Sequence, residues 1–75
     1  MAKLPRPTGR EMIEFLVRRG FQVVRVRGSH HFLESEQRRT CVPVHGKRNL
    51  KIGTLRSILR DIEMSPAEFE REFRG

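Results

Sequence analysis

Three histidines, His30, His31 and His45, are the side chains of this sequence best suited to proton transfer. An imidazole in a free peptide titrates at about pH 6.5, so one such side chain both accepts and donates a proton near neutral pH. This property suits attack of a ribose 2′-hydroxyl on its neighbouring phosphate. His30 follows Gly28-Ser29, and a flexible turn there would hold its ring at the surface. His30 is therefore a candidate catalytic residue, and the alternative is a strand histidine that packs or hydrogen-bonds structurally.

His31 and His45 differ in whether they can share a catalytic site with His30. Successive side chains of a strand point to opposite faces, so His30 and His31 are not expected to converge on one substrate atom. His45 ends a predicted strand and begins a basic loop. It serves either as a second acid or base of the same site or as a solvated loop residue, and the sequence leaves both interpretations open.

The sequence contains no pattern typical of a metal or cofactor site. There is no C-x-x-C or H-x-x-x-H pair, no P-loop, no dinucleotide-binding glycine motif and no paired-carboxylate arrangement, so neither metal nor cofactor is expected. Cys41 is the single cysteine, which excludes an internal disulfide and favours the cytoplasm. We expect Cys41 to be a small buried hydrophobic residue. No apolar stretch approaches the ~18 residues of a membrane span, and no signal-peptide segment is visible, so no membrane association is expected.

The chain is strongly basic, with 16 Lys and Arg, 9 Asp and Glu and a formal net charge of +7 over 75 residues. This balance indicates a polyanionic partner, and the alternative is a solvated basic surface without a ligand. The excess lies before residue 61, whereas residues 61–75 are acidic. Three basic clusters are predicted to bind the phosphates of a nucleic acid: Arg25 and Arg27 beside the histidines, Arg38 and Arg39 on the turn, and Lys47, Arg48 and Lys51 in the loop. Arg56 and Arg60, one helical turn apart, could add further phosphate contacts.

The elements that would position these residues follow from local patterns. Thr8 to Glu11 has capping-box spacing and begins a predicted helix over 9–19, which ends at Gly20. Three short segments rich in β-branched and aromatic residues predict strands over 21–27, 30–34 and 39–44. Residues 35–38 form a predicted turn between the second and third strands. Pro43 places the third strand at an edge or near its end.

Two further helices are predicted after the basic loop of residues 45–52. Leu55, Ile58, Leu59 and Ile62 form a helical apolar stripe, with Gly53 and Thr54 available at its N-terminus. Ser65-Pro66 and Glu68 begin a short last helix or helical turn. The sequence thus predicts one α+β domain over residues 1–75, with order α-β-β-β-α, a three-stranded antiparallel sheet, helices on one face and a terminal helical turn.

Several ordered motifs together resemble the HicA toxin family of type II toxin–antitoxin systems. They span about residues 6–70 and comprise Arg19-Gly20-Phe21, Gly28-Ser29-His30-His31-Phe32, Val42-Pro43-Val44-His45 and the segment 51–60. The resemblance implies a double-stranded-RNA-binding-domain-like fold and a metal-independent mRNA interferase, an endoribonuclease that arrests translation. It assigns the catalytic role to the histidine after Gly28-Ser29, which is His30. It also implies a HicB antitoxin as partner, and the size and charge of the free toxin are compatible with a monomer.

One position departs from the family pattern, because Glu63 stands where the family usually has a glycine after the second long helix. The acid that protonates the leaving 5′-oxygen also stays open between His45, Lys47 and His30 itself. Two alternatives to the enzyme remain at this point. One is a non-catalytic RNA-binding module that uses the same basic surface, and the other is a structural protein whose basic face docks on an acidic partner.

Overall fold

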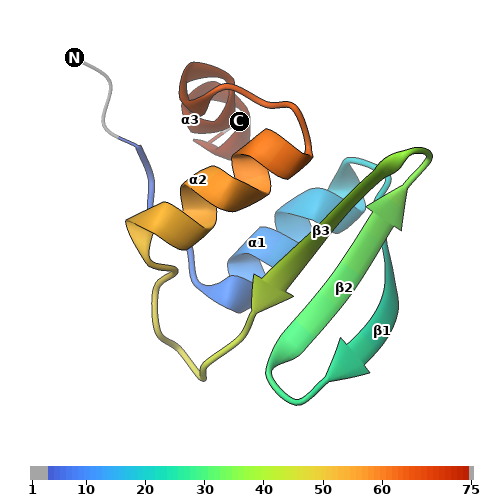
Figure 1. The fold of residues 1–75 in the computed structure, drawn as a ribbon. Coiled ribbons are helices and arrows are strands. Elements are labelled where there is room, and N and C mark those ends of the chain that lie inside the picture. Colours follow the sequence, from blue (N-terminus) through green and yellow to red (C-terminus); the bar gives the residue numbers. More distant parts are fainter. Residues whose placement is uncertain (1–3, 75) are drawn as a thin grey trace.

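The computed structural model of the protein describes residues 4–74 and contains three helices and three strands within them (Figure 1). In chain order they are α1 (Gly9–Arg18), β1 (Gln22–Arg27), β2 (His30–Ser35), β3 (Arg38–Pro43), α2 (Ile52–Asp61) and α3 (Pro66–Arg74). The predicted α-β-β-β-α order and the α+β class are confirmed. The predicted last helix is also present, and its nine residues make it longer than a single turn.

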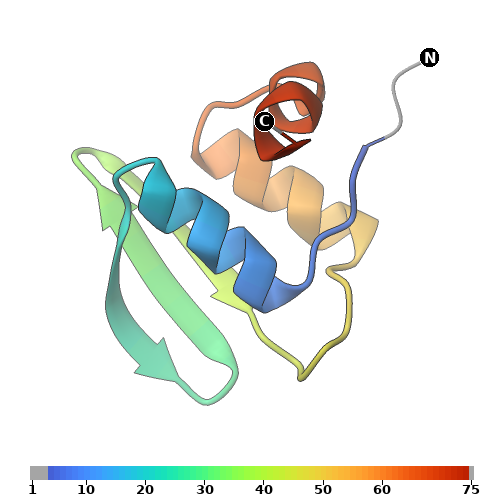
Figure 2. The ribbon, with the colours of Figure 1, turned by 180° about the vertical axis from the view of Figure 1, so that it is seen from behind.

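The sheet has the order β1-β2-β3, and both strand pairs are antiparallel. Helices α1 and α2 lie on one face of it, as Figures 1 and 2 show from opposite sides. Leu33, Thr40 and Val42 are buried and therefore point toward the helices. The opposite face, which we call the outer face, carries no helix within residues 4–74.

Apolar side chains from α1, α2, α3 and the sheet form one core. Its members include Met12, Leu16, Leu33, Leu55 and Leu59, all at most 2% exposed. Helix α3 contributes a fully buried ring, because Phe69 packs edge-on against Phe15 with ring centroids 5.1 Å apart. None of the helices described over residues 4–74 has the length and apolar character needed to cross a membrane.

Both ends of α1 follow the predicted local chemistry. Thr8 Oγ1 accepts a hydrogen bond from the Glu11 N–H at 3.1 Å, and Glu11 accepts one from the Thr8 N–H at 2.8 Å. At the other end Gly20 has a left-handed φ of 99°, and the Phe21 N–H donates to the Leu16 carbonyl at 3.0 Å. These bonds satisfy carbonyl groups that would otherwise lack partners at the helix end.

Helix α2 begins earlier than the sequence predicts. Its N-cap is Lys51, and Gly53 and Thr54 lie inside its first turn instead of capping it. Its C-terminus forms the same hydrogen-bonded motif as α1, with Glu63 at the left-handed position with φ 59°. The helix therefore ends at the position where the resemblance implies a glycine, with a glutamate in the left-handed conformation.

Candidate functional site

The turn between β1 and β2 fixes the start of β2. Gly28 has a left-handed φ of 60°, a conformation that side chains disfavour. The Ser29 carbonyl accepts a hydrogen bond from the Val44 N–H at 2.8 Å and lies 3.2 Å from His31 Nδ1. These contacts tie the turn to the end of β3, so the backbone that carries His30 is held from two strands.

His30 and His31 lie on opposite faces of β2, as strand alternation predicts. His31 is half-buried and its ring contacts the Ser29 carbonyl, whereas His30 is exposed on the outer face. His30 Nδ1 lies 3.5 Å from Cys41 Sγ, within hydrogen-bonding reach of sulfur. Of the two rings, the His30 ring is therefore the one accessible to a large substrate.

The prediction that Cys41 is a buried hydrophobic residue is wrong. Cys41 is only half-buried and lies on the outer face beside His30, while Thr40 is the buried side chain and donates to Asp61 Oδ2 at 2.9 Å. The alternation of Thr40, Val42 and Val44 could have revealed this phase, because β-branched residues fill the inward positions. Partial burial, reinforced by the Asp61 carboxylate, raises the pKa of the Cys41 thiol. The thiol beside His30 is therefore neutral at neutral pH.

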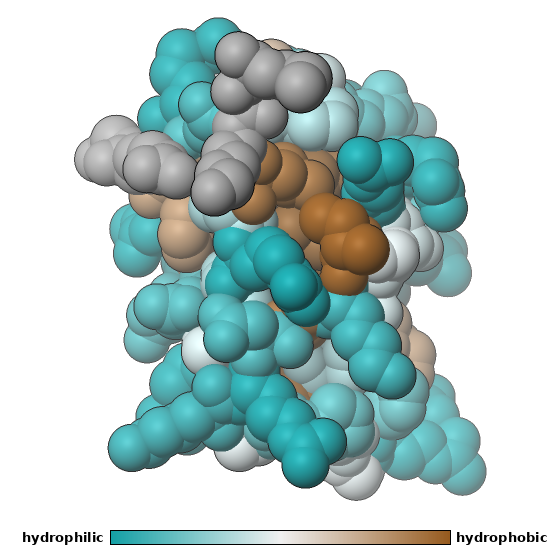
Figure 3. All heavy atoms as spheres, turned by 90° about the vertical axis from the view of Figure 1, so that its left-hand side faces the viewer, coloured by the Kyte–Doolittle hydropathy of each residue, from teal (hydrophilic) through white to brown (hydrophobic). Residues whose placement is uncertain are grey.

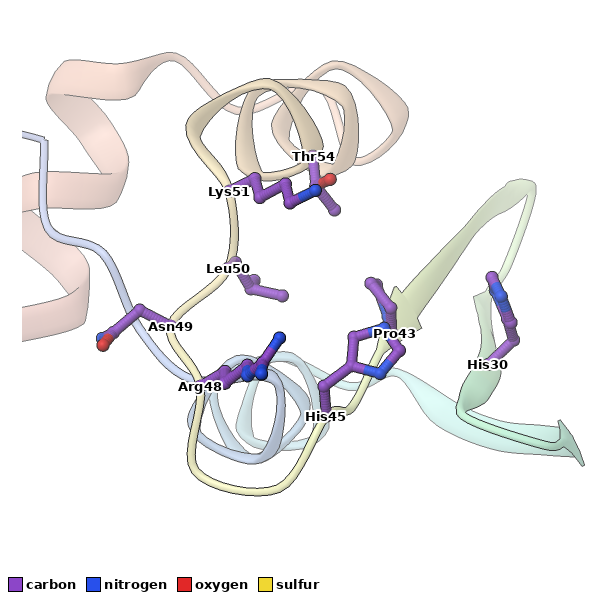
Figure 4. A pocket seen from close by; sticks show the side chains of 8 residues that line it. All are labelled: His30, Pro43, His45, Arg48, Asn49, Leu50, Lys51 and Thr54. Atoms are coloured by element: carbon purple, nitrogen blue, oxygen red, sulfur yellow. The ribbon is translucent and has the colours of Figure 1, made fainter.

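A hollow of about 390 Å³ brings His30 and His45 together with part of the basic loop (Figure 4). His30 comes from the start of β2 and lies at one margin, His45 follows the end of β3, and Arg48 and Lys51 come from the loop before α2. The remaining lining residues are Pro43, Asn49, Leu50 and Thr54. Two imidazoles and two cations thus face one open hollow, an arrangement that combines proton transfer with anion binding.

Other predicted phosphate-binding residues lie outside this hollow. Arg25 and Arg27 are exposed on β1, and Arg27 is the direct cross-strand neighbour of His30. Lys47 is exposed in the loop but does not line the hollow. Arg38 and Arg39 begin β3 at the opposite end of the sheet, because His30 pairs with Pro43 and Ser35 with Arg38. The side of the molecule drawn in Figure 3 is mainly hydrophilic, with a smaller hydrophobic area.

A segment before α1 holds the end of the basic loop, a role that the sequence analysis missed. The Leu50 N–H donates to the Pro7 carbonyl at 2.8 Å, and the Arg6 guanidinium donates to the Leu50 carbonyl at 3.1 and 3.3 Å. Asn49 Nδ2 also donates to the Arg6 carbonyl, and Thr8 forms a β-bridge with Asn49. No local signal in the sequence predicts this pairing, because more than 40 residues separate Arg6 from Leu50.

The N-terminus of α2 adds a further positive element to the hollow. Within residues 4–74 no side chain caps it, and its first turn contains no acidic residue. Its unpaired N–H groups and helix dipole favour an anion nearby. Since Lys51 and Thr54 line the hollow, this helix end borders the same space as His30 and His45. No cluster of three or more His, Cys, Asp or Glu side chains that could hold a metal ion occurs among the residues that the structure describes.

Comparison with the sequence profiles of known families gives a match to this chain. None of the curated proteins compared with the chain matches it. The sequence profile of the family described as the HicA toxin of bacterial toxin–antitoxin systems matches residues 9–64, which include the whole sheet, α1, α2 and every residue that lines the hollow. The match covers most of the chain, and the chain therefore belongs to the HicA toxin family of bacterial toxin–antitoxin systems.

Proposed function

We propose that this toxin is a metal-independent endoribonuclease that cleaves mRNA in the cytoplasm and thereby arrests translation. The observation that carries the proposal is the shared hollow, in which the exposed His30 and His45 rings face the cations of Arg48 and Lys51. Imidazoles supply proton transfer near neutral pH, and the cations match the charge of a phosphodiester. No resident metal is needed for this chemistry.

In the proposed reaction His30 removes the proton from a ribose 2′-hydroxyl. The 2′-oxygen then forms a bond to the adjacent phosphorus, and the bond between phosphorus and the 5′-oxygen breaks. The leaving 5′-oxygen takes a proton from His45, whose position in the hollow favours it over Lys47, which lies outside. Charge that develops on the phosphate is stabilised by Arg48, Lys51 and the uncapped N-terminus of α2.

The proposed partner in the cell is a HicB-type antitoxin. An antitoxin that covers the hollow would exclude RNA from His30 and would meet the same basic side chains. A partner of this kind needs acidic groups opposite Arg48 and Lys51. The free toxin is proposed to be a monomer.

The deciding experiment compares the purified protein with its His30→Ala variant on RNA. We expect the wild-type protein to shorten RNA in the presence of chelator and to arrest growth when expressed alone. His30→Ala should lose at least about 100-fold in cleavage rate, because a general acid or base contributes about 10²–10⁴-fold. The exposure of His30 makes it a substitution that leaves the fold intact, which circular dichroism checks.

His45→Ala tests whether His45 is the general acid. If His45 protonates the leaving oxygen, this variant should also lose cleavage while it still binds RNA. Retained RNA binding with no cleavage by the wild-type protein, and equal binding by His30→Ala, would instead identify a non-catalytic RNA-binding module. Equal toxicity of wild type and His30→Ala would refute the catalytic role of His30.

A further inference from the structure

One aromatic ring lies outside the hydrophobic core. Of the five phenylalanines, Phe15, Phe21 and Phe69 are buried in the core and Phe73 packs against it, whereas Phe32 belongs to neither group. Phe32 occupies the central strand β2 and pairs across the sheet with Arg25 and with Cys41. Its neighbour Leu33 is buried toward the helices, so Phe32 points to the outer face.

The position of this ring has no explanation in core packing. The solvated face of an antiparallel sheet is normally polar, and no helix covers the outer face within residues 4–74. The Arg25 guanidinium lies over the Phe32 ring, 5.4 Å from its centroid. The ring and the guanidinium border a second hollow of about 190 Å³, which Glu34 and Arg39 also line. The outer face therefore carries a half-buried aromatic ring beneath a guanidinium group, with polar groups at their edge.

We propose that Phe32 and Arg25 form a stacking site for a nucleobase of the RNA that His30 cleaves. This inference rests on the proposed function and extends it from phosphate chemistry to base recognition. Proteins bind unpaired bases by stacking them on aromatic rings and on guanidinium planes. Glu34 and Arg39 provide a hydrogen-bond acceptor and donors for the edge of such a base.

The distance along β2 fits this assignment. His30 and Phe32 project from the same face of one strand, two residues and therefore about 7 Å apart. A nucleotide beside the cleaved phosphate can thus place its base on Phe32 while the phosphate lies at His30. Arg25 then contributes its guanidinium plane to the base, in place of the phosphate contact expected from the sequence. The substrate that this geometry favours is single-stranded, because a paired base has no free face.

The test uses a short RNA with one cleavage site and the full chain. Phe32→Leu retains an apolar side chain without the π-surface, and we expect its KM to rise at least about fivefold, which corresponds to about 1 kcal/mol for one stacked base. The value of kcat should change less, because His30 is untouched. Phe32→Tyr keeps the ring and should keep the wild-type KM. Arg25→Lys keeps the charge but not the plane, and should also raise KM.

An abasic substrate locates the stacked nucleotide. When the base beside the cleaved bond is removed, the wild-type KM should rise by a similar factor, and Phe32→Leu should then have no additional effect. An unchanged KM for Phe32→Leu on the intact RNA, in a protein that cleaves and loses cleavage in His30→Ala, overturns the stacking site alone. Failure of the wild-type protein to cleave refutes the proposed activity instead, and dissociation constants measured by fluorescence anisotropy then still test the stacking. Weakened antitoxin binding by Phe32→Leu with unaltered RNA binding would assign this face to a protein partner and overturn the inference.

Discussion

Basic residues lie at both ends of the sheet, but within residues 4–74 only those at one end have carboxylate partners. At the end that contains the Gly28-Ser29 turn and the hollow, which we call the site end, Arg48 and Lys51 form no ion pair within the part of the chain that the structure describes. At the far end, where Ser35–Arg38 turns, Arg38 lies 3.4 Å from Glu63. Arg39 lies 3.9 Å from Glu34 on the neighbouring strand. The absence of carboxylate partners for Arg48 and Lys51 among the described residues therefore distinguishes the end of the sheet that can bind a polyanion.

The left-handed backbone positions differ in part between the two ends. The site end uses glycines alone, with φ of 60° at Gly28 and 58° at Gly46. The far end has Gly20 beside Ser35 but also uses glutamates at Glu36 and Glu63, with φ of 53° and 59°. A side chain in this conformation costs about 1–2 kcal/mol, which glycine avoids. The far end thus retains a carboxylate opposite Arg38 at the expense of backbone strain, whereas the site end leaves its cations without carboxylates.

The largest effect is expected when the unpaired cations are removed. Arg48→Ala combined with Lys51→Ala should weaken RNA binding by about tenfold or more, because two charge-assisted contacts to phosphate are lost. The slope of log affinity against log salt should become shallower by about 0.7 for each contact. The matched control, Arg19→Ala with Arg38→Ala, removes the same charge from positions that are ion-paired with Glu72 and Glu63 and lie outside both hollows. Equal losses in both double variants, measured by anisotropy over a salt series, would contradict the distinction between the two ends.

A second prediction concerns how closely the elements approach at the site end. A Cβ atom at Gly9 would overlap the Pro43 carbonyl oxygen, where α1 packs against the end of β3. Gly9→Ala should therefore lower the free energy of unfolding by about 1–3 kcal/mol, the range for overpacking. Gly53→Ala is the matched control, since its Cβ would meet nothing within 4 Å and it should stabilise the protein by about 0.4–1 kcal/mol. Urea denaturation of both variants tests this, and a Gly9→Ala protein as stable as wild type would show that the approach is not tight.

Replacement of Glu63 tests the strain at the far end. Glu63→Gly and Glu63→Ala both lose the exposed ion pair with Arg38, which contributes little. Only glycine relieves the left-handed conformation, so Glu63→Gly should be more stable than Glu63→Ala by about 1 kcal/mol. Thermal midpoints of the two variants give the comparison. Equal midpoints would mean that Glu63 is not strained.

The smallest expected effect concerns the cap of α3. The Ser65 backbone N–H donates to the Glu68 carboxylate, and the Ser65 hydroxyl accepts from the Glu68 backbone N–H. The Ser65 backbone N–H first, and then its hydroxyl, hold the pKa of the Glu68 carboxyl below the ordinary 4.5. This contribution to stability is present above pH 4.5 and is lost as the pH falls through the lowered pKa. Ser65→Ala should cost about 0.5 kcal/mol at neutral pH through loss of the N-cap hydroxyl. The backbone N–H of residue 65 still donates to Glu68 in that variant, so Glu68→Gln, which removes the carboxylate, tests the pH dependence. The difference in unfolding free energy between wild type and Glu68→Gln should shrink in acid, and a difference that is constant with pH would exclude the link to the Glu68 carboxylate.

Local patterns in the sequence predicted most of the fold. The capping box at Thr8, the glycine stop at Gly20 and the Ser65 cap all depend on neighbouring residues, so they form independently of tertiary contacts. The start of α2 was predicted too late, because Lys51 caps it without a side-chain bond that a sequence pattern could reveal. The face of β3 on which Cys41 lies was also predicted wrongly, because a shift of one residue exchanges the two faces of a strand.

The candidate site was predicted only in part. The Gly28-Ser29 turn placed His30 at the surface, but the sequence left His45 either solvated or part of the site, and the structure places both rings on one hollow. The residues before α1 that hold the loop at Leu50 gave no signal, because more than 40 residues separate the two sides of the contact.

The sequence by itself determined the kinds of element, their order, the excess of positive charge and the histidine available for proton transfer. Each of these depends on residue type or on spacings of a few residues. The tertiary structure alone decided which cations lie near His30, which are paired with carboxylates, and that Phe32 lies on the outer face beneath Arg25. Those outcomes depend on which face of the sheet the helices cover and where the loops return, and contacts between distant residues fix both.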